Sequence, residues 1–102
     1  MIYKLIAILL IVRLASAFSF EAWSEHNFLG NVKTYTTKGS FSPGFVIKSY
    51  RWDSPPASDD CCVRMCNGQQ DVGYWCVSHS NGTPSSDFNK IIIGCGSDKL
   101  VC

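Results

Sequence analysis

Six cysteines between residues 61 and 102 constrain this chain more than any other feature of its sequence. They are Cys61, Cys62, Cys66, Cys76, Cys95 and Cys102. An even number of cysteines in a short exported chain is the usual mark of a disulfide framework. Such chains bury only a modest core, and one native bridge typically contributes about 2–5 kcal/mol to their stability. The sequence therefore predicts three disulfides, and it does not choose among the roughly fifteen possible pairings.

The neighbouring cysteines Cys61 and Cys62 carry a further expectation. If they lie in a strand, their side chains point to opposite faces, so each should bond to a different partner. Zinc ligation by Cys61, Cys62, Cys66 and His79 is the alternative. However, Cys-Cys-x3-Cys is not a zinc spacing, and an oxidising compartment favours disulfides over thiolate ligands. We therefore expect bridges and no metal cofactor.

The first seventeen residues have the organisation of a cleavable signal peptide. Lys4 supplies the positive start, Leu5–Val12 forms the apolar run, and Ala15-Ser16-Ala17 places small side chains before the cleavage point. The run is much shorter than the roughly 20 apolar residues that cross a bilayer. The sequence predicts a signal peptide over 1–17 and one secreted domain over 18–102, without stable membrane insertion. An uncleaved N-terminal anchor is the alternative.

The charge of the exported part is close to zero. Loss of Lys4 and Arg13 with the signal peptide leaves seven Lys and Arg against eight Asp and Glu, a net charge of −1. A near-neutral chain without a basic run offers little to a phosphate backbone or to anionic lipid. Nucleic-acid binding is therefore not expected.

The pattern of residue types predicts a chain made of short strands. Threonine, aromatic and β-branched residues alternate with Gly, Pro, Asn and Ser, as is typical of strands joined by turns. The predicted strands are Phe18–Trp23, Asn31–Thr37, Phe45–Trp52, Val63–Cys66, Val72–Val77 and Lys90–Gly94. Asp53–Ser58 is predicted to connect two halves, and His79–Asp87 to be a polar surface loop. That loop contains Asn81-Gly82-Thr83, an acceptor sequon for glycosylation at Asn81.

An internal repeat relates the two halves. The stretch from Trp23 to Gly30 contains an aromatic residue, four others, Phe28, one more residue and then glycine. The same frame recurs from Cys66 to Gly73, with the glycine in register and both aromatics replaced. The repeat predicts two four-strand units, about 18–53 and about 60–102, folded as a two-sheet sandwich.

The frame has a physical explanation. A hairpin folded over its own sheet would place Trp23 against Phe28, and Gly30 would adopt a backbone conformation that a side chain blocks. Ser49, on a later strand, can then hydrogen-bond the folded hairpin.

Trp23-x4-Phe28-x-Gly30, followed by Ser49 within Ser-Tyr-Arg-Trp, resembles the Greek-key motif of the βγ-crystallin superfamily. The second half keeps Gly73 and has Asn89 where the motif has serine. The resemblance implies an all-β fold, in which two Greek-key motifs form a small disulfide-stapled β-sandwich. The chain also resembles small secreted cysteine-rich proteins of filamentous fungi, some of which carry this fold.

Two kinds of site are disfavoured. Many βγ-crystallins bind calcium through paired Asn/Asp-Asn/Asp-x-x-Ser/Thr-Ser stretches, but 44–48 lacks a carboxylate and 81–86 lacks the second oxygen ligand. Calcium needs about six to eight oxygens, so no calcium site is expected. Catalysis is not expected either. The chain has only two histidines, His26 and His79, no serine in a nucleophile elbow and no spare cysteine.

Two adjacent aromatic residues suggest a contact surface. Tyr74 and Trp75 alternate across a predicted strand, so one of them must face outward. We expect a monomeric, non-enzymatic protein that binds an extracellular protein or glycan. The fungal resemblance implies the role of an effector or of an antimicrobial or killer-toxin-like protein. Two alternatives stay open. One is a proteinase inhibitor with 79–86 as its exposed loop, and the other is a carbohydrate-binding or wall-associated module.

Overall fold

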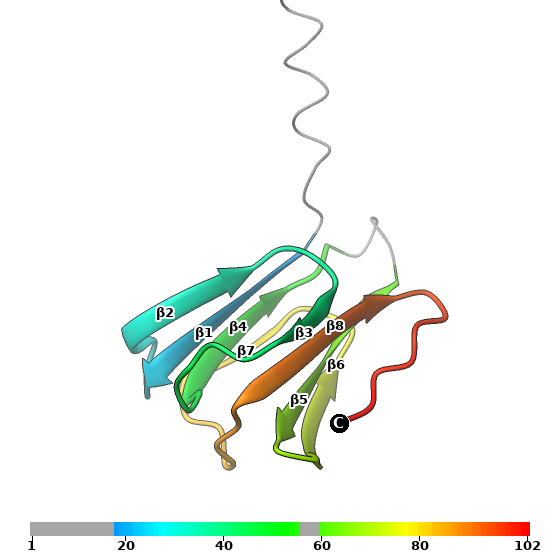
Figure 1. Cartoon of the computed structure of the whole chain (residues 1–102). Coiled ribbons are helices and arrows are strands. Elements are labelled where there is room, and N and C mark those ends of the chain that lie inside the picture. Colours follow the sequence, from blue (N-terminus) through cyan, green and yellow to red (C-terminus); the bar gives the residue numbers. More distant parts are fainter. Residues whose placement is uncertain (1–17, 56–59) are drawn as a thin grey trace, which may run out of the picture.

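Two four-stranded antiparallel sheets pack face to face in the computed structural model of the protein (Figure 1). The structure describes residues 18–55 and 60–102, so the predicted signal peptide lies outside the described residues. The strands are β1 (Ser19–Glu25), β2 (Leu29–Tyr35), β3 (Gly39–Phe41), β4 (Ser49–Asp53), β5 (Cys61–Asn67), β6 (Gln70–Trp75), β7 (His79–Asn81) and β8 (Lys90–Cys95). The predicted all-β, disulfide-stapled sandwich is confirmed.

The two halves of the chain exchange their shortest strands. One sheet has the order β2-β1-β4-β7 and the other has the order β3-β8-β5-β6. Each half therefore supplies three of its four strands to one sheet. The remaining strand, the third along that half of the chain, joins the other sheet. β3 pairs with β8, and β7 pairs with β4, so the halves interlock while sharing one topology.

All six predicted strands are present, with ends shifted by a few residues. The largest shift is at β4, which begins at Ser49, because Ile47 makes only an isolated bridge to Phe88. The sequence does not predict β3 and β7. Each has three residues, which is too short for a recognisable alternation. The prediction of a loop over 79–87 is wrong at its start, because His79–Asn81 forms β7.

Alternation along the strands builds the core between the sheets. On β1, Phe20 and Ala22 are fully buried, while Glu21 between them is only partly covered. Trp52 on β4 is also fully buried, and its ring lies 6.4 Å from that of Phe20. Burial of one such large side chain contributes about 1.5–3 kcal/mol. The other buried hydrophobic residues are Ile47, Tyr50, Cys61, Val63, Met65, Cys66, Phe88, Ile91 and Ile93.

The hairpin between β1 and β2 folds back as its sequence predicts. The Trp23 and Phe28 rings meet edge to face, with centroids 5.2 Å apart. The buried Ser49 Oγ accepts a hydrogen bond from Phe28 N–H (2.9 Å) and donates one to the Glu25 carbonyl (2.6 Å). Gly30 has φ +85°, and a Cβ there would lie 2.4 Å from Ser24 Oγ. We call Trp23, Phe28, Gly30 and Ser49 the hairpin lock.

The lock holds two residues in a costly backbone conformation. Asn27 has φ +61° and Phe28 has φ +62°, values that non-glycine residues rarely adopt. Such positions cost about 1–3 kcal/mol each and persist where surrounding contacts determine them. Here Ser49 holds the Phe28 N–H, and the Gly82 carbonyl accepts a hydrogen bond from Asn27 N–H at 2.8 Å. The folded hairpin is thus tied to both halves.

All three disulfides lie within the second half. They join Cys61 to Cys95, Cys62 to Cys76, and Cys66 to Cys102. The adjacent cysteines 61 and 62 have different partners, which confirms the prediction from their alternation. No cysteine among 18–55 and 60–102 is free.

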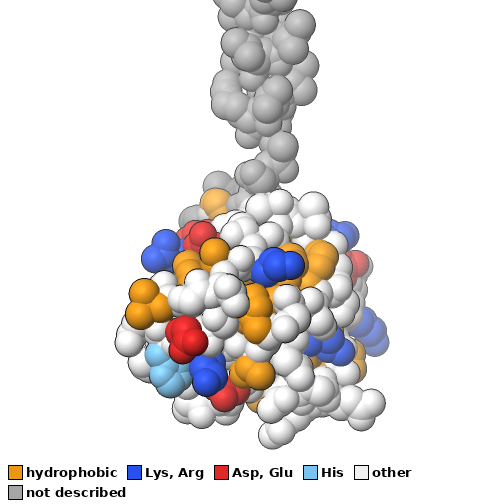
Figure 2. All heavy atoms as spheres, turned by 60° about the vertical axis from the view of Figure 1, so that its left-hand side comes forward, with side chains coloured by type: hydrophobic (Ala, Val, Ile, Leu, Met, Phe, Trp, Pro, Cys, Tyr) orange, Lys and Arg blue, Asp and Glu red, His pale blue; other side chains and the backbone are white. Residues whose placement is uncertain are grey.

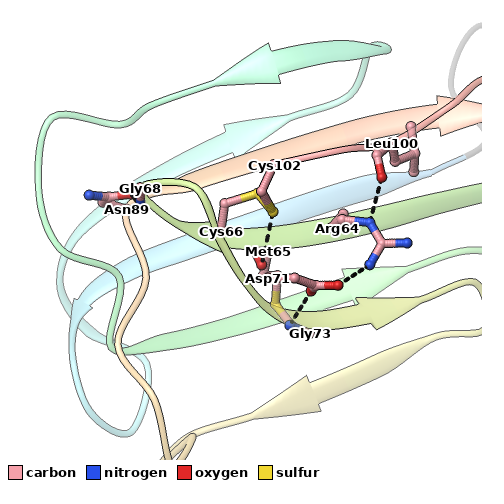
Figure 3. Close-up of a disulfide and its surroundings, with 9 residues drawn as sticks. All are labelled: Arg64, Met65, Cys66, Gly68, Asp71, Gly73, Asn89, Leu100 and Cys102. Atoms are coloured by element: carbon pink, nitrogen blue, oxygen red, sulfur yellow. Dashed lines mark hydrogen bonds and ion pairs between the residues drawn. A yellow bond between two sulfur atoms is a disulfide. The ribbon is translucent and has the colours of Figure 1, made fainter.

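The Cys66–Cys102 bridge fastens the C-terminal segment over the second sheet (Figure 3). Arg64 Nε donates a hydrogen bond to the Leu100 carbonyl at 2.6 Å, and the Arg64 guanidinium pairs with Asp71. The Leu100 side chain lies so close to β8 that a Cβ on Gly94 would approach its Cδ2 to 2.5 Å.

Gly73 does not share the backbone conformation of Gly30, although the two occupy the same position in the sequence repeat. The backbone of Gly73 is not in the positive-φ region, and this residue lies opposite Met65 in the ladder between β5 and β6. The turn conformation belongs to Gly68, at φ +62°. Asn89 takes over part of the serine's role, because its Oδ1 accepts a hydrogen bond from Gly68 N–H at 3.1 Å. The prediction that Gly73 matches Gly30 is therefore wrong, since the β5–β6 turn is tighter than the β1–β2 turn.

Candidate functional site

The strongest candidate for a functional site is a groove on the side of the sandwich where the edge strands β6 and β7 meet. It has a volume of about 270 Å³. We call it the β6–β7 groove. Its lining comprises Tyr50, Met65, Val72, Gly73, Tyr74, Trp75, His79, Asn81, Pro84, Ser85, Ser86 and Phe88.

A stack of two rings connects the edges of the two sheets in this groove. The Trp75 and His79 rings are nearly parallel, with an interplanar angle of 8° and centroids 3.6 Å apart. The Tyr50 hydroxyl lies 2.9 Å from His79 Nδ1 and forms a hydrogen bond with it. The three side chains come from β6, β7 and β4, so they meet only because β7 crosses to the first sheet.

The turn between Trp75 and His79 is fixed at several points. The Cys62–Cys76 disulfide holds its start. Trp52 Nε1 donates a hydrogen bond to the Cys76 carbonyl at 3.4 Å. Ser78 Oγ accepts a hydrogen bond from Ser54 N–H at 2.8 Å and donates one to the Ser54 carbonyl at 3.3 Å. The ring stack is therefore preorganised by the core and by a covalent bridge.

The groove is electrically neutral near pH 7. Burial lowers the pKa of His79, so the imidazole is uncharged at neutral pH. Burial also raises the pKa of the Tyr50 phenol, and the hydrogen bond from the Trp75 side chain opposes this rise. Among the lining residues in the described part of the chain there is no Lys, Arg, Asp or Glu.

The rim of the groove is a short loop over 82–87 that is anchored at both ends. At its start, the Gly82 carbonyl accepts a hydrogen bond from Asn27 N–H, and Asn81 Oδ1 accepts one from Thr83 N–H at 2.9 Å. At its end, Phe88 bridges to Ile47 and is buried. Asn81, the predicted glycosylation acceptor, is the last residue of β7 and is half-buried. Its side chain thus faces the groove region and not a free loop.

Tyr74 and Trp75 diverge, as their alternation predicts. Tyr74 is the outward residue, 46% exposed, and the Arg64 guanidinium lies 4.2 Å from its ring centroid. Trp75 points inward and packs partly against the core. From the sequence alone, Tyr50 was not a candidate site residue. His79 was a candidate only for a zinc ligand, a catalytic base or part of a surface loop. No local signal in the sequence places these two side chains beside Trp75.

On the face that carries β2, the exposed hydrophobic residues are dispersed. Figure 2 shows hydrophobic side chains scattered there among charged ones. Leu29 and Val32 are 61% and 50% exposed. Isolated exposed hydrophobic residues are normal on soluble domains, whereas contiguous patches mark contact sites.

The histidines are placed differently from one another. His26 is exposed in the folded hairpin, whereas His79 is held by Tyr50 at Nδ1 and by Trp75 on one face of its ring.

Within 18–55 and 60–102, no group of three or more His, Cys, Asp or Glu side chains is arranged to hold a metal ion. Over the same residues, the structure contains no helix long and apolar enough to span a bilayer.

Comparison with known proteins identifies no relative. No protein-family model, no curated protein sequence and no solved structure matches this chain.

Proposed function

We propose that this chain is a secreted, non-enzymatic protein that acts by binding an extracellular target through the β6–β7 groove. The observation that carries the proposal is the Trp75–His79 stack, a neutral aromatic surface fixed by a disulfide and by hydrogen bonds to the core. Rigid aromatic groups beside polar ones are typical of binding sites, because little side-chain entropy is lost on binding. Three disulfides in a small domain support an extracellular location.

We further propose that the scaffold is of the βγ-crystallin type. Two features support this: the third strand of each half lies in the opposite sheet, and the hairpin lock holds a folded hairpin over β1. Within the resemblance to fungal cysteine-rich proteins, the role would be that of an effector or of an antimicrobial or killer-toxin-like protein.

A binding role without catalysis fits the state of His79. A catalytic histidine is usually oriented by a carboxylate, yet the described lining of the groove contains no Asp or Glu, and His79 Nδ1 is bonded instead to a tyrosine that is only 3% exposed. A tyrosine of raised pKa is also a poor nucleophile at neutral pH.

A direct test uses the purified oxidised protein, fluorescently labelled, on a panel of intact fungal, bacterial and plant cells and their isolated walls. Two matched variants accompany it. Ser85→Trp places a large ring in the groove rim, and Ser97→Trp makes the same change on an exposed turn outside the groove. We expect the wild type and Ser97→Trp to bind at least one surface and Ser85→Trp to lose most of that binding. Equal binding by all three proteins would overturn the proposal, and so would no binding to any surface.

A proteinase inhibitor is the second candidate, because the loop over 82–87 is anchored at both ends. Inhibitors of this kind present a rigid exposed segment, and Thr83, Ser85, Ser86 and Asp87 are all exposed. Inhibition of a panel of serine, cysteine and aspartic proteases, with cleavage mapped to this loop, would favour this candidate over the groove.

A further inference from the structure

We propose that the ligand of the β6–β7 groove is a neutral saccharide, of which one or two rings enter the groove. The inference depends on the proposed binding function and names the chemical class of the ligand. It follows from four properties: the charge of the groove, its combination of aromatic and polar side chains, its volume, and the hydrogen bonding along the neighbouring edge of β6.

The charge of the groove excludes strongly ionic ligands. Its described lining contains no Lys, Arg, Asp or Glu, and burial keeps His79 neutral at pH 7. The Arg64 guanidinium, which lies 4.2 Å from the ring centroid of Tyr74, is already paired with Asp71. A phosphate or carboxylate ligand would find no opposite charge to offset its loss of hydration. A ligand that enters must therefore be uncharged.

The combination of aromatic and polar side chains in the groove is complementary to a sugar ring. Trp75 and the exposed Tyr74 provide flat apolar area, while Asn81, Ser85 and Ser86 provide amide and hydroxyl groups that both donate and accept hydrogen bonds. A neutral sugar has the complementary arrangement, with C–H groups on the faces of its ring and hydroxyls around the rim. Purely apolar ligands would leave these polar groups without partners, which costs about 1–3 kcal/mol for each buried group.

The volume limits how much of a ligand can enter. At about 270 Å³, the groove lies just below the range of roughly 300–1,000 Å³ that holds drug-sized ligands. A site of this size accommodates one or two sugar rings, with the remainder of an oligosaccharide outside. Affinity should therefore be modest, and repeated sites on a cell wall would raise it through multivalency.

The strand edge beside the groove disfavours a peptide that adds as an extra strand. The ladder between β5 and β6 shifts register between Met65 and Cys66, so that Val72 forms a bulge. The Gly73 N–H is bonded to Asp71 Oδ1 at 3.1 Å, which removes a donor from the strand edge. A bulge, or a backbone N–H that already has a hydrogen-bond partner, disfavours the addition of another strand at that edge. A saccharide does not need a regular edge.

The test is a titration of the ¹⁵N-labelled, oxidised protein, followed by NMR at the Trp75 indole and the Asn81 side-chain amide. The probes are neutral tetrasaccharides of β-1,4-N-acetylglucosamine, β-1,3-glucose and α-1,6-mannose. Tetragalacturonate is an anionic control of similar size, and acetyl-Gly-Tyr-Pro-Gly-amide is a neutral peptide control. Ser85→Trp and Ser97→Trp are titrated alongside the wild type.

We expect at least one neutral tetrasaccharide to shift both signals saturably, with a Kd below about 1 mM. Ser85→Trp should weaken this binding by about tenfold or more, and Ser97→Trp should leave it unchanged. Equal binding of tetragalacturonate would overturn the proposal of a neutral ligand. Binding of the peptide alone, blocked by Ser85→Trp, would overturn the saccharide but leave the proposed function standing. If neither binds and the labelled protein binds no cell surface, both proposals are overturned.

Discussion

In the first half of the molecule, Trp23, Phe28 and Ser49 hold a folded hairpin over the sheet, whereas every disulfide lies in the second half. Both halves nevertheless have the same strand topology. At the frame position of Trp23 the second half has Cys66, which is bonded to Cys102. In place of the buried Ser49 it has the exposed Asn89.

The difference shows that one topology can be stabilised in two ways. Aromatic packing and a buried hydroxyl lower the free energy of the folded first half. Bridges act mainly by raising the free energy of the unfolded second half. The second half could therefore lose its aromatic pair without losing its fold. Substitutions at matched positions of the two halves test this division.

The largest effect should come from the bridges. Replacement of Cys66 and Cys102 together by alanine should lower the free energy of unfolding by about 3.8 kcal/mol, because the bridge closes a separation of 36 residues. Replacement of Cys62 and Cys76, which are 14 residues apart, should cost about 3.0 kcal/mol. Urea unfolding followed by tryptophan fluorescence measures both. A Cys66/Cys102 variant as stable as the wild type would contradict the proposed role of the bridges.

The next effect concerns the residues that tie each hairpin. Ser49→Ala should cost about 2–3 kcal/mol, since it leaves the Phe28 N–H and the Glu25 carbonyl without their partner in a buried place. Asn89→Ala, its counterpart in the second half, should cost about 0.5–1 kcal/mol because water can reach the freed group. Urea unfolding of both variants, with the disulfides intact, gives the comparison. Equal losses would show that the two halves depend on their hairpin ties alike.

A smaller difference is expected at the turn glycines. Gly30→Ala should cost about 2 kcal/mol, because φ is +85° and the new Cβ would approach Ser24 Oγ and Glu25 Cγ. Gly68→Ala should cost about 1 kcal/mol, since it also has a positive φ but no atom within 4 Å of the new Cβ. Thermal unfolding would rank the two variants, and a larger loss at Gly68 would refute the steric explanation.

The smallest effect is a dependence on pH at the contact between the halves. The pKa of His79 is lower in the folded protein than its ordinary value of about 6.5, so this group contributes stability that is complete above pH 6.5. That contribution is lost as the pH falls through the folded pKa. Asp98, whose pKa is lowered by a hydrogen bond from Cys95 N–H and by Lys38, acts only in a more acidic window.

The measurement compares unfolding in urea between pH 7.5 and about 5 for the wild type and for His79→Gln. The wild type should lose stability over this range, and His79→Gln should lose less. NMR titration of His79 gives its pKa directly, and a value above 6.5 would reverse the predicted sign.

The sequence predicted the parts of the fold that depend on nearby residues. The hairpin lock could be predicted because Trp23, Phe28 and Gly30 lie within eight positions, and Ser49 stands in a recognisable strand. The different partners of Cys61 and Cys62 followed from strand alternation alone. Three bridges were expected from the number of cysteines, but their pairing depends on which strands become neighbours.

The candidate site could not be predicted for the same reason. Tyr50, Trp75 and His79 come from three strands, and they meet only after β7 joins the first sheet. β7 has three residues and a polar sequence, so nothing local marks it as a strand. Gly73 shows the opposite failure, because a match in sequence spacing was not a match in turn geometry.

The reciprocal placement of β3 and β7 has a consequence for how this molecule can come apart. Neither half contains all the strands of its own sheet, so the point that divides the sequence does not divide the structure. A chain cut between β4 and β5 would consist of two complementary fragments, and each fragment would supply one strand to the sheet formed mainly by the other. Folding and loss of structure should accordingly involve both halves at once.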